Sequence, residues 1–262
     1  MLTPNWASAP KMTKRQKYAS ISIGLTLALA VAQTNHAGWV GDLIWIMGPL
    51  ITTFWALDFD LKREEWWLLP TYPLLWSISV LILTSQIAPA TVWWGIELLF
   101  FGVGFYGLLL ATNIINISTL RPLPLVRTAT TVMYLYGLWC GFILLYALVV
   151  RQLPVHIWVI AASLLSCGVS WPLLWISEGQ KQRTRRSLRW VGFTGLIVAE
   201  LSLLVSFWPS SFMTSLLLAT TTIVLVGIIH QQTRRLLTSS LMKQYLFLEG
   251  TVVLLFYLFS KW

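Results

Sequence analysis

Charged residues are scarce in this sequence: they make up 10% of its 262 residues, whereas 57% of the residues are hydrophobic. A soluble domain of this length would need far more polar surface to cover its core. We therefore expect the chain to lie in a lipid bilayer. The formal net charge is +9, but the basic residues stand in short segments between apolar runs. This arrangement predicts membrane topology and argues against nucleic acid as a partner.

Cysteines and metal-binding motifs are also nearly absent. The two cysteines, Cys140 and Cys167, lie inside apolar runs, which excludes a disulfide framework and a CxxC-type metal or redox site. The three histidines are far apart in the sequence, and neither an HExxH motif nor a Ser/His/Asp set at a shared depth is present. We therefore expect no metal and no cofactor, and the sequence favours a protein that is not an enzyme.

Long apolar runs are what the sequence has in abundance. A transmembrane helix needs about 20 predominantly apolar residues to cross roughly 30 Å of hydrocarbon. The predicted spans are 18–33, 39–57, 66–85, 91–117, 125–150, 155–177, 190–208, 212–230 and 239–260. In the second span, Gly48 and Pro49 predict a kink or a break. The sequence thus predicts an all-α, polytopic membrane bundle of about nine transmembrane helices, formed by residues 18–262 as one domain after a polar tail at 1–17.

The basic residues predict how these helices are oriented. If the N-terminus is cytoplasmic, only two of the 18 lysines and arginines, Arg151 and Lys261, fall on the outside. Cytoplasmic segments of membrane proteins carry just such an excess of positive charge. We therefore expect a cytoplasmic N-terminus, an outside C-terminus and a plasma-membrane location.

Two glutamates are predicted near the centre of their spans. Glu200 and Glu249 each follow an arginine-bearing segment, and the similar stretches 182–200 and 231–249 are offset by 49 positions (231 − 182). At 1.5 Å per residue, each glutamate would lie roughly 17 Å into the bilayer. A repeat of two helical hairpins, 155–208 and 212–260, would explain the offset, and so would biased composition.

Ionisable side chains inside a membrane are functional candidates by default, because an aspartate or basic residue there costs on the order of 3 kcal/mol. Glu97 is a third such residue, roughly 9 Å from the outer end of its span. No lysine or arginine stands at a comparable depth. Glu200, Glu249 and Glu97 are therefore candidates for a proton or cation relay in a transport or permeation protein. Alternatively, each neutral carboxyl makes one hydrogen bond that joins two helices.

A second group of polar residues is predicted at the inner end of the fourth span. Asn113 and Asn116 are three residues apart and share a helix face, and Arg121 and Arg127 follow them. Arginine forks at this depth suit lipid phosphates. The group supports a second hypothesis, a lipid-acting membrane enzyme or a lipid-binding protein at the inner leaflet. Alternatively, the amides cap a helix end beside ordinary cytoplasmic arginines.

Two short motifs carry a family resemblance. They are Phe59-Asp60-Leu61 followed by Glu65-Trp66, and Asn113-Ile114-Ile115-Asn116 followed by Arg121 and Arg127. These motifs resemble an uncharacterised family of multi-pass membrane proteins from ultra-small bacteria of the candidate phyla radiation. The resemblance implies a bacterial cytoplasmic membrane and no particular activity. The chain departs from the family pattern at Thr112, where an acidic residue would directly precede Asn113, and this weakens the case for catalysis there.

A third hypothesis needs no small-molecule site at all. The predicted connections between spans are short, so whatever the protein does takes place within the bilayer or at its surface. An assembly factor or scaffold in the membrane would satisfy the sequence equally well. The partners we expect are membrane lipids and further protein chains, in a homo-oligomer or a hetero-oligomer.

Overall fold

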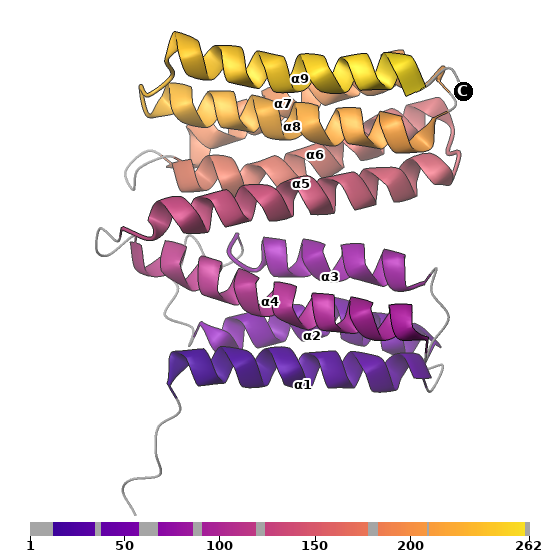
Figure 1. Cartoon of the computed structure of the whole chain (residues 1–262), viewed down its shortest axis with the longest axis vertical. Helices are drawn as coiled ribbons and strands as arrows, with labels where there is room; N and C mark the ends of the chain where they lie inside the picture. The colour runs from indigo at the N-terminus through magenta and orange to yellow at the C-terminus, as the bar shows by residue number, and fades with distance from the viewer. Residues whose placement is uncertain are drawn as a thin grey trace, which may run out of the picture.

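The computed structural model describes residues 13–34, 38–57, 68–85, 91–118, 124–177, 183–208 and 210–259, and these residues form nine α-helices and no strand (Figure 1). The helices are α1 (Lys14–Thr34), α2 (Gly38–Ala56), α3 (Thr71–Thr84), α4 (Val92–Ser118), α5 (Val126–Val150), α6 (Val155–Ser177), α7 (Arg183–Val205), α8 (Ser211–Thr233) and α9 (Ser239–Phe259). The prediction of an all-α fold is confirmed.

Six of these helices, α4 to α9, are long and apolar enough to cross a membrane. Shorter apolar stretches lie in α2 (Leu43–Ala56) and in α3 (Thr71–Thr84). Lipid-exposed polypeptide within a bilayer must satisfy its backbone hydrogen bonds internally, and helices achieve this. The architecture is therefore that of an α-helical membrane bundle.

Several helix boundaries differ from the sequence prediction by a few residues, and three differences are instructive. α3 begins at Thr71 rather than 66, because Leu68, Leu69 and Pro70 form a turn before it. α7 begins at Arg183, so the arginine-rich segment joins the helix; arginine is a good helix former, and the apolar pattern had excluded it. α2 continues through Pro49 without the break that the sequence allowed.

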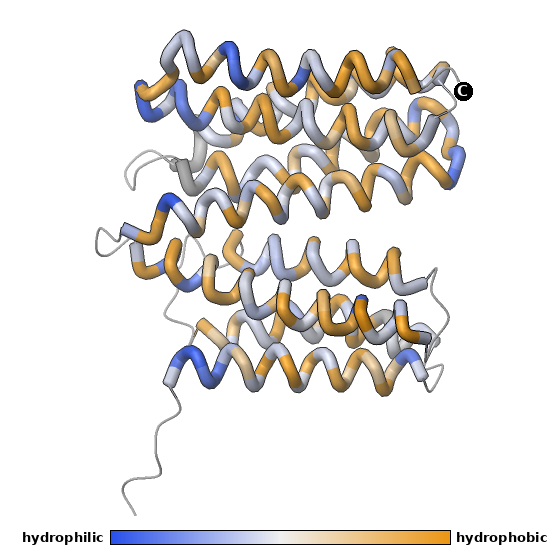
Figure 2. Tube along the Cα trace, viewed as in Figure 1, coloured by the Kyte–Doolittle hydropathy of each residue, from blue (hydrophilic) through white to orange (hydrophobic). Residues whose placement is uncertain are grey.

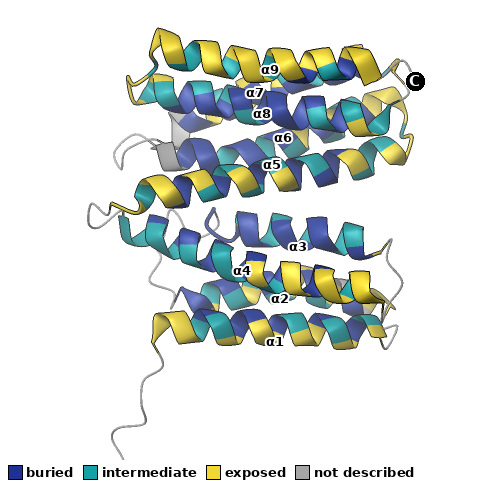
Figure 3. Cartoon of the chain, viewed as in Figure 1, coloured by how far each residue is buried: buried dark blue, intermediate teal, exposed yellow. Residues whose placement is uncertain are grey.

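The helices form two groups that lie one above the other in Figure 1. Helices α1 to α4 pack among themselves, and so do α5 to α9. Helix α5 packs against α3 and α4 and so connects the groups, and α3 also contacts α6. Within the second group, α8 is central, because it packs against α5, α6, α7 and α9. Accordingly, Figure 3 shows α8 largely buried and α9 largely exposed.

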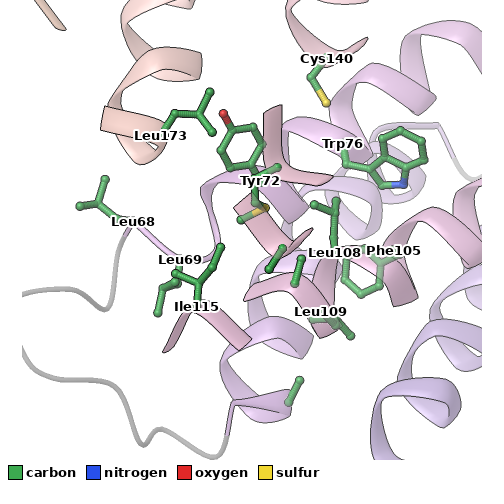
Figure 4. Packing of buried hydrophobic residues seen from close by; sticks show 14 of the residues in the cluster. Leu68, Leu69, Tyr72, Trp76, Phe105, Leu108, Leu109, Ile115, Cys140 and Leu173 are labelled. Atoms are coloured by element: carbon green, nitrogen blue, oxygen red, sulfur yellow. The ribbon is translucent and has the colours of Figure 1, made fainter. Parts of the chain in front are cut away.

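Aromatic residues of α3 hold the two groups together. The Tyr72 hydroxyl donates to the carbonyl oxygen of Val169 in α6, at 2.8 Å. The Trp76 ring packs edge-on against the Tyr136 ring of α5, with 4.9 Å between the ring centroids; its indole N–H donates within the first group, to the carbonyl oxygen of Phe101 in α4, at 3.3 Å. Figure 4 shows both rings among buried side chains from both groups, including Leu108 and Leu173. The hydrophobic core is therefore continuous across the junction.

Charge is distributed unevenly between the two ends of the bundle. Helices α1, α5, α7 and α9 begin at one end, which we call the basic end, and α8 ends there (Figures 1 and 2). Among the described lysines and arginines, Arg151 alone lies at the opposite end. Lys261, the other basic residue predicted outside, lies beyond the described residues. The described part of the chain thus has the charge asymmetry that the positive-inside rule requires.

The contact between α3 and α4 predicts an asymmetric response to two glycine substitutions in α4. A Cβ added at Gly104 would overlap the Trp76 ring, whereas one at Gly95 meets nothing within 4 Å. We expect Gly104→Ala to destabilise the protein by about 1–3 kcal/mol through overpacking. Gly95→Ala should be neutral or stabilising, because alanine is the better helix former. Unfolding of both variants in detergent, followed by circular dichroism, measures this. Equal stability of the two variants would contradict the packing of Trp76 on Gly104.

Candidate anion-binding pocket

A pocket of about 640 Å³ opens at the basic end, between α5, α8 and α9. Helix α5 contributes one face to it, because Arg127, Thr130, Thr131 and Tyr134 stand three, four and seven residues apart. Helix α8 contributes His230 and Gln231 of its last turn, and its C-cap residue Arg234. The pocket therefore combines aromatic, hydroxyl and basic side chains from helices that are distant in the sequence.

A tyrosine and a histidine form the inner wall of the pocket. The Tyr134 hydroxyl lies 2.9 Å from Nδ1 of His230, whose side chain is only 5% exposed. When the hydroxyl donates to Nδ1, a neutral ring carries its proton on Nε2. The hydrogen bond orients both side chains.

Two arginines line the pocket, one from the start of α5 and one from the end of α8. Arg127 is the second residue of α5, Arg234 is the C-cap of α8, and both side chains are exposed. No carboxylate lines this pocket in the part of the chain that the structure describes. An arginine guanidinium presents donors in a planar fork that matches carboxylate and phosphate oxygens. The pocket is therefore suited to an anion.

Two backbone hydrogen bonds fix the turn that follows α8 and carries Arg234. The N–H of Leu236 donates to the carbonyl oxygen of Gln231 at 2.9 Å, and that of Arg235 donates to Gln232 at 3.0 Å. This pair of bonds is a Schellman motif, in which the residue after the C-cap adopts the left-handed conformation. Arg235 occupies that position with φ 57°. An arginine thus stands where glycine is usual.

A glycine shapes the wall that α9 provides. A Cβ on Gly227 of α8 would lie 2.8 Å from Cε1 and 2.9 Å from the hydroxyl oxygen of Tyr245. Because Gly227 has no side chain, the Tyr245 ring packs directly against the α8 backbone. Tyr245 then forms a wall of the pocket together with Leu241, one turn earlier on α9.

Of the four inner-leaflet residues predicted from the sequence, one lines this pocket. Arg127 is part of it, whereas the half-buried Asn113 and Asn116 lie on α4 and are not. Arg121 lies outside the described residues. The structure therefore associates Arg127 with residues of α8 and α9 rather than with the two asparagines.

The three glutamates lie in three different environments. Glu200 is exposed on α7, and Glu249 of α9 is half-buried against α8, where its carboxyl group is hydrogen-bonded to the Thr221 hydroxyl. Glu97 of α4 is 9% exposed, and neither of its carboxyl oxygens has a hydrogen-bond partner among the described residues. None of the three lines the pocket at the basic end. The shared central cavity that the sequence suggested for Glu200 and Glu249 thus stays a prediction.

Sequence reasoning missed Tyr134, His230 and Tyr245 as members of one site. The sequence placed His230 at the inner end of one predicted helix and Arg127 near the inner end of another, so the two shared a depth. It could not show that α5 and α8 are neighbours, because helix order in a bundle depends on packing. The seven-residue interval from Arg127 to Tyr134 was the available signal for a polar face on α5.

Comparisons of this chain with protein-family models, curated proteins and solved structures find no match. The class of the protein therefore follows from its own structure. Six helices that are long and apolar enough to span a membrane define it as an α-helical integral membrane protein.

The left-handed Arg235 leads to a stability prediction. A non-glycine residue in this conformation costs roughly 1–2 kcal/mol, so Arg235→Gly should raise the thermal midpoint, whereas Arg235→Ala should not. Gln152, with φ 47° at the opposite end of the bundle, offers a matched control. Gln152→Gly should be stabilising to a similar extent. A lower thermal midpoint for Arg235→Gly in detergent would contradict this prediction. It would mean that contacts of the arginine side chain stabilise the fold by more than the left-handed backbone costs.

Proposed function

We propose that this protein is a multi-pass protein of a bacterial plasma membrane that binds an anionic lipid through its phosphate headgroup. The observation that carries the proposal is the pocket at the basic end, which two exposed arginines line together with half-buried Tyr134 and buried His230, and which no carboxylate lines among the described residues. Phosphate oxygens are good acceptors for arginine forks.

The topology we propose has nine spans, with the basic end in the cytoplasm and the C-terminus outside. The charge asymmetry supports this orientation. Helix α1 has 21 residues and α2 has 19, which correspond to roughly 30 Å of helix. Helix α3 has only 14, and its buried entry turn at Leu68 to Pro70 extends it. The pocket would then open where headgroups of the inner leaflet lie.

The pocket offers polar groups that suit the headgroup of an anionic lipid and apolar groups that suit its acyl chains. Arg127 and Arg234 would hold the phosphate, and the side chain of Gln231 offers donors and acceptors to a polyol headgroup. Leu236 and Leu241 provide apolar surface for the first part of the acyl chains. A free inorganic anion would use the arginines but gain nothing from the leucines, which is why we favour a lipid.

The lipid proposal predicts that both arginines contribute to affinity. Each basic residue near an anionic membrane surface is worth about 1 kcal/mol, or about fivefold in affinity. We expect Arg127→Gln with Arg234→Gln to weaken binding of phosphatidylglycerol to the detergent-solubilised protein by about 25-fold. Native mass spectrometry measures the bound fraction of phosphatidylglycerol, with phosphatidylcholine as the competing lipid without net charge.

The control for this experiment is Arg151→Gln, which removes one charge at the opposite end of the bundle. That variant should bind phosphatidylglycerol like the wild type. Glycerol phosphate, which shares the phosphate but has no acyl chains, should compete only weakly. Equal loss with Arg151→Gln, or no loss in the double variant, would contradict a headgroup site between α5 and α8.

Two carboxyl groups favour proton-linked transport as a second candidate function. The Thr221 hydroxyl lies 2.8 Å from the carbonyl oxygen of Leu217 and also contacts Oε1 of Glu249. A hydroxyl has one proton, so both contacts are satisfied together when a neutral Glu249 donates to Thr221. Oε2 of Glu249 and both oxygens of Glu97 are buried without a partner in the described part of the chain. Such groups suit exchange of a proton.

The transport candidate predicts loss of proton flux without loss of fold. An amide at position 249 can keep a hydrogen bond to Thr221 but cannot release a proton at physiological pH. Glu249→Gln and Glu97→Gln should therefore abolish flux in liposomes that contain a pH-sensitive dye. Thr220→Val, which removes a hydroxyl that bonds to carbonyl oxygens of its own helix, serves as the packing control. Flux that persists in both glutamine variants, or that the wild type lacks, would exclude this function.

A further inference from the structure

A second pocket, of about 280 Å³, lies at the end of the bundle opposite the basic end. It is formed where α5 and α7 end and where α6 and α8 begin (Figure 1). Pockets that bind small molecules have volumes of about 300 to 1,000 Å³. The second pocket is close to the lower limit of this range, so its ligand would be about the size of one ring.

The lining of the second pocket is polar but uncharged. Its polar side chains include Gln152, Ser206, Ser211 and Thr214, and none of its described lining residues is ionisable. The exposed Arg151 precedes Gln152 in the sequence but does not line the pocket. Two helices contribute their N-terminal ends and two contribute their C-terminal ends, so the opposite partial charges of the helix dipoles offset one another. The second pocket therefore suits a ligand that is polar and has no net charge.

The Thr214 hydroxyl is an exception among the hydroxyls of α8. Those of Ser215, Thr220 and Thr222 donate to the carbonyl oxygen one turn earlier. Thr214 lines the second pocket and is only 2% exposed, yet its hydroxyl has no hydrogen-bond partner among the described residues. A buried hydroxyl without a partner costs free energy. A polar ligand in the second pocket would supply the missing partner.

Two tryptophans belong to the same lining. Trp158 is buried, and its indole N–H lies 3.4 Å from the carbonyl oxygen of Ser202. Trp208 is 43% exposed, and its ring stands edge-on to that of Phe256 in α9, with 5.7 Å between the centroids. Tryptophan is common at membrane interfaces, so the rings alone decide nothing. Beside the unpartnered hydroxyl, however, they add flat apolar surface on which the C–H groups of a ring can pack.

We propose that the second pocket binds an uncharged polyhydroxyl group of the size of one sugar ring. Each hydroxyl of such a group both donates and accepts, as the Gln152 amide and the Thr214 hydroxyl require. The Ser206 hydroxyl donates to the carbonyl oxygen of Leu203 at 2.7 Å, so its oxygen is left as an acceptor. A free sugar and the sugar headgroup of a glycolipid share this chemistry. The second pocket has no residue in common with the pocket at the basic end.

Binding of neutral sugars to the protein in lipid nanodiscs tests this proposal. The probes are the methyl glycosides of glucose, galactose and mannose, observed by ligand NMR, and glucosyl diacylglycerol, observed by native mass spectrometry. Binding of a methyl glycoside would identify a free sugar as the ligand, and binding of the glycolipid alone would identify a lipid headgroup. Methyl glucuronide has the same ring with a carboxylate and should bind more weakly. Binding of the glucuronide as tight as that of the glucoside, or no binding of any neutral probe, would overturn the proposal.

Two substitutions test the residues of the second pocket. Thr214→Val keeps the shape of the side chain, so the thermal midpoint should stay the same or rise, whereas loss of one hydrogen bond should weaken binding of the neutral probe by about fivefold. Trp208→Ala should also weaken binding, and Trp208→Phe should restore part of it.

The matched control is Thr220→Val, because the Thr220 hydroxyl bonds within α8 and does not line the second pocket. It should bind the neutral probe like the wild type. Unchanged binding in Thr214→Val and Trp208→Ala, or an equal loss in Thr220→Val, would overturn the site. Phosphatidylglycerol binding at the basic end should be the same in all these variants, so failure of this proposal is distinguishable from failure of the proposed function.

Discussion

The cost of leaving a polar group unsatisfied in hydrocarbon is the constraint on which this structure depends. Each backbone N–H and C=O within the membrane needs a partner from the protein itself, so the described chain is almost entirely helical. The same constraint applies to side chains. Hydroxyls within the helices return to the carbonyl one turn earlier, as Thr53, Ser77 and Thr222 do. Polar residues can therefore stand inside the spans without a partner from another helix.

Hydrogen bonds between helices form where a polar side chain cannot reach a carbonyl oxygen of its own helix. Tyrosine and tryptophan cannot bond to their own helix, so their polar atoms reach across to a neighbour. Tyr72 reaches α6, Trp76 reaches α4, and Tyr136 donates to the carbonyl oxygen of Gly104 at 2.8 Å. Glycine at the point of contact lets the rings approach the neighbouring backbone, as at Gly104 and Gly137. Large aromatic rings paired with glycines thus decide which helices are adjacent.

The ionisable residues divide by depth into two kinds of site. At the basic end, Arg127 and Arg234 stand beside a pocket at the level of headgroups, where charge is stable and anions are available. Away from the pocket, Glu97 is buried and Glu249 is half-buried against α8, whereas Glu200 faces outward. The first kind suits binding of a lipid. The second suits proton exchange where the group is enclosed.

How much could be predicted from the sequence depends on the range of the interactions involved. Helix number, the extent of most helices and the charge asymmetry follow from apolar periodicity and from composition, which are local properties of the chain. The start of α7 at Arg183 was missed, because an apolar run cannot show how far a helix extends into a charged segment. Likewise, the unbroken passage through Pro49 depends on surroundings that a local rule does not include.

By itself, the sequence determined that this protein is a helical membrane protein with one basic end. Its preference for lipid over water depends on the overall content of apolar and charged residues, and its topology depends on the order of apolar and basic segments along the chain. Only the tertiary structure decided which polar residues meet. It brought Arg127 and Tyr134 to His230 and Tyr245 and left Asn113 outside that pocket. It also turned Glu249 inward and Glu200 outward, although both occupy equivalent positions in similar segments. The physical reason is that the rotation of a helix about its axis, and the choice of its neighbours, are set by packing between side chains that are distant in the sequence.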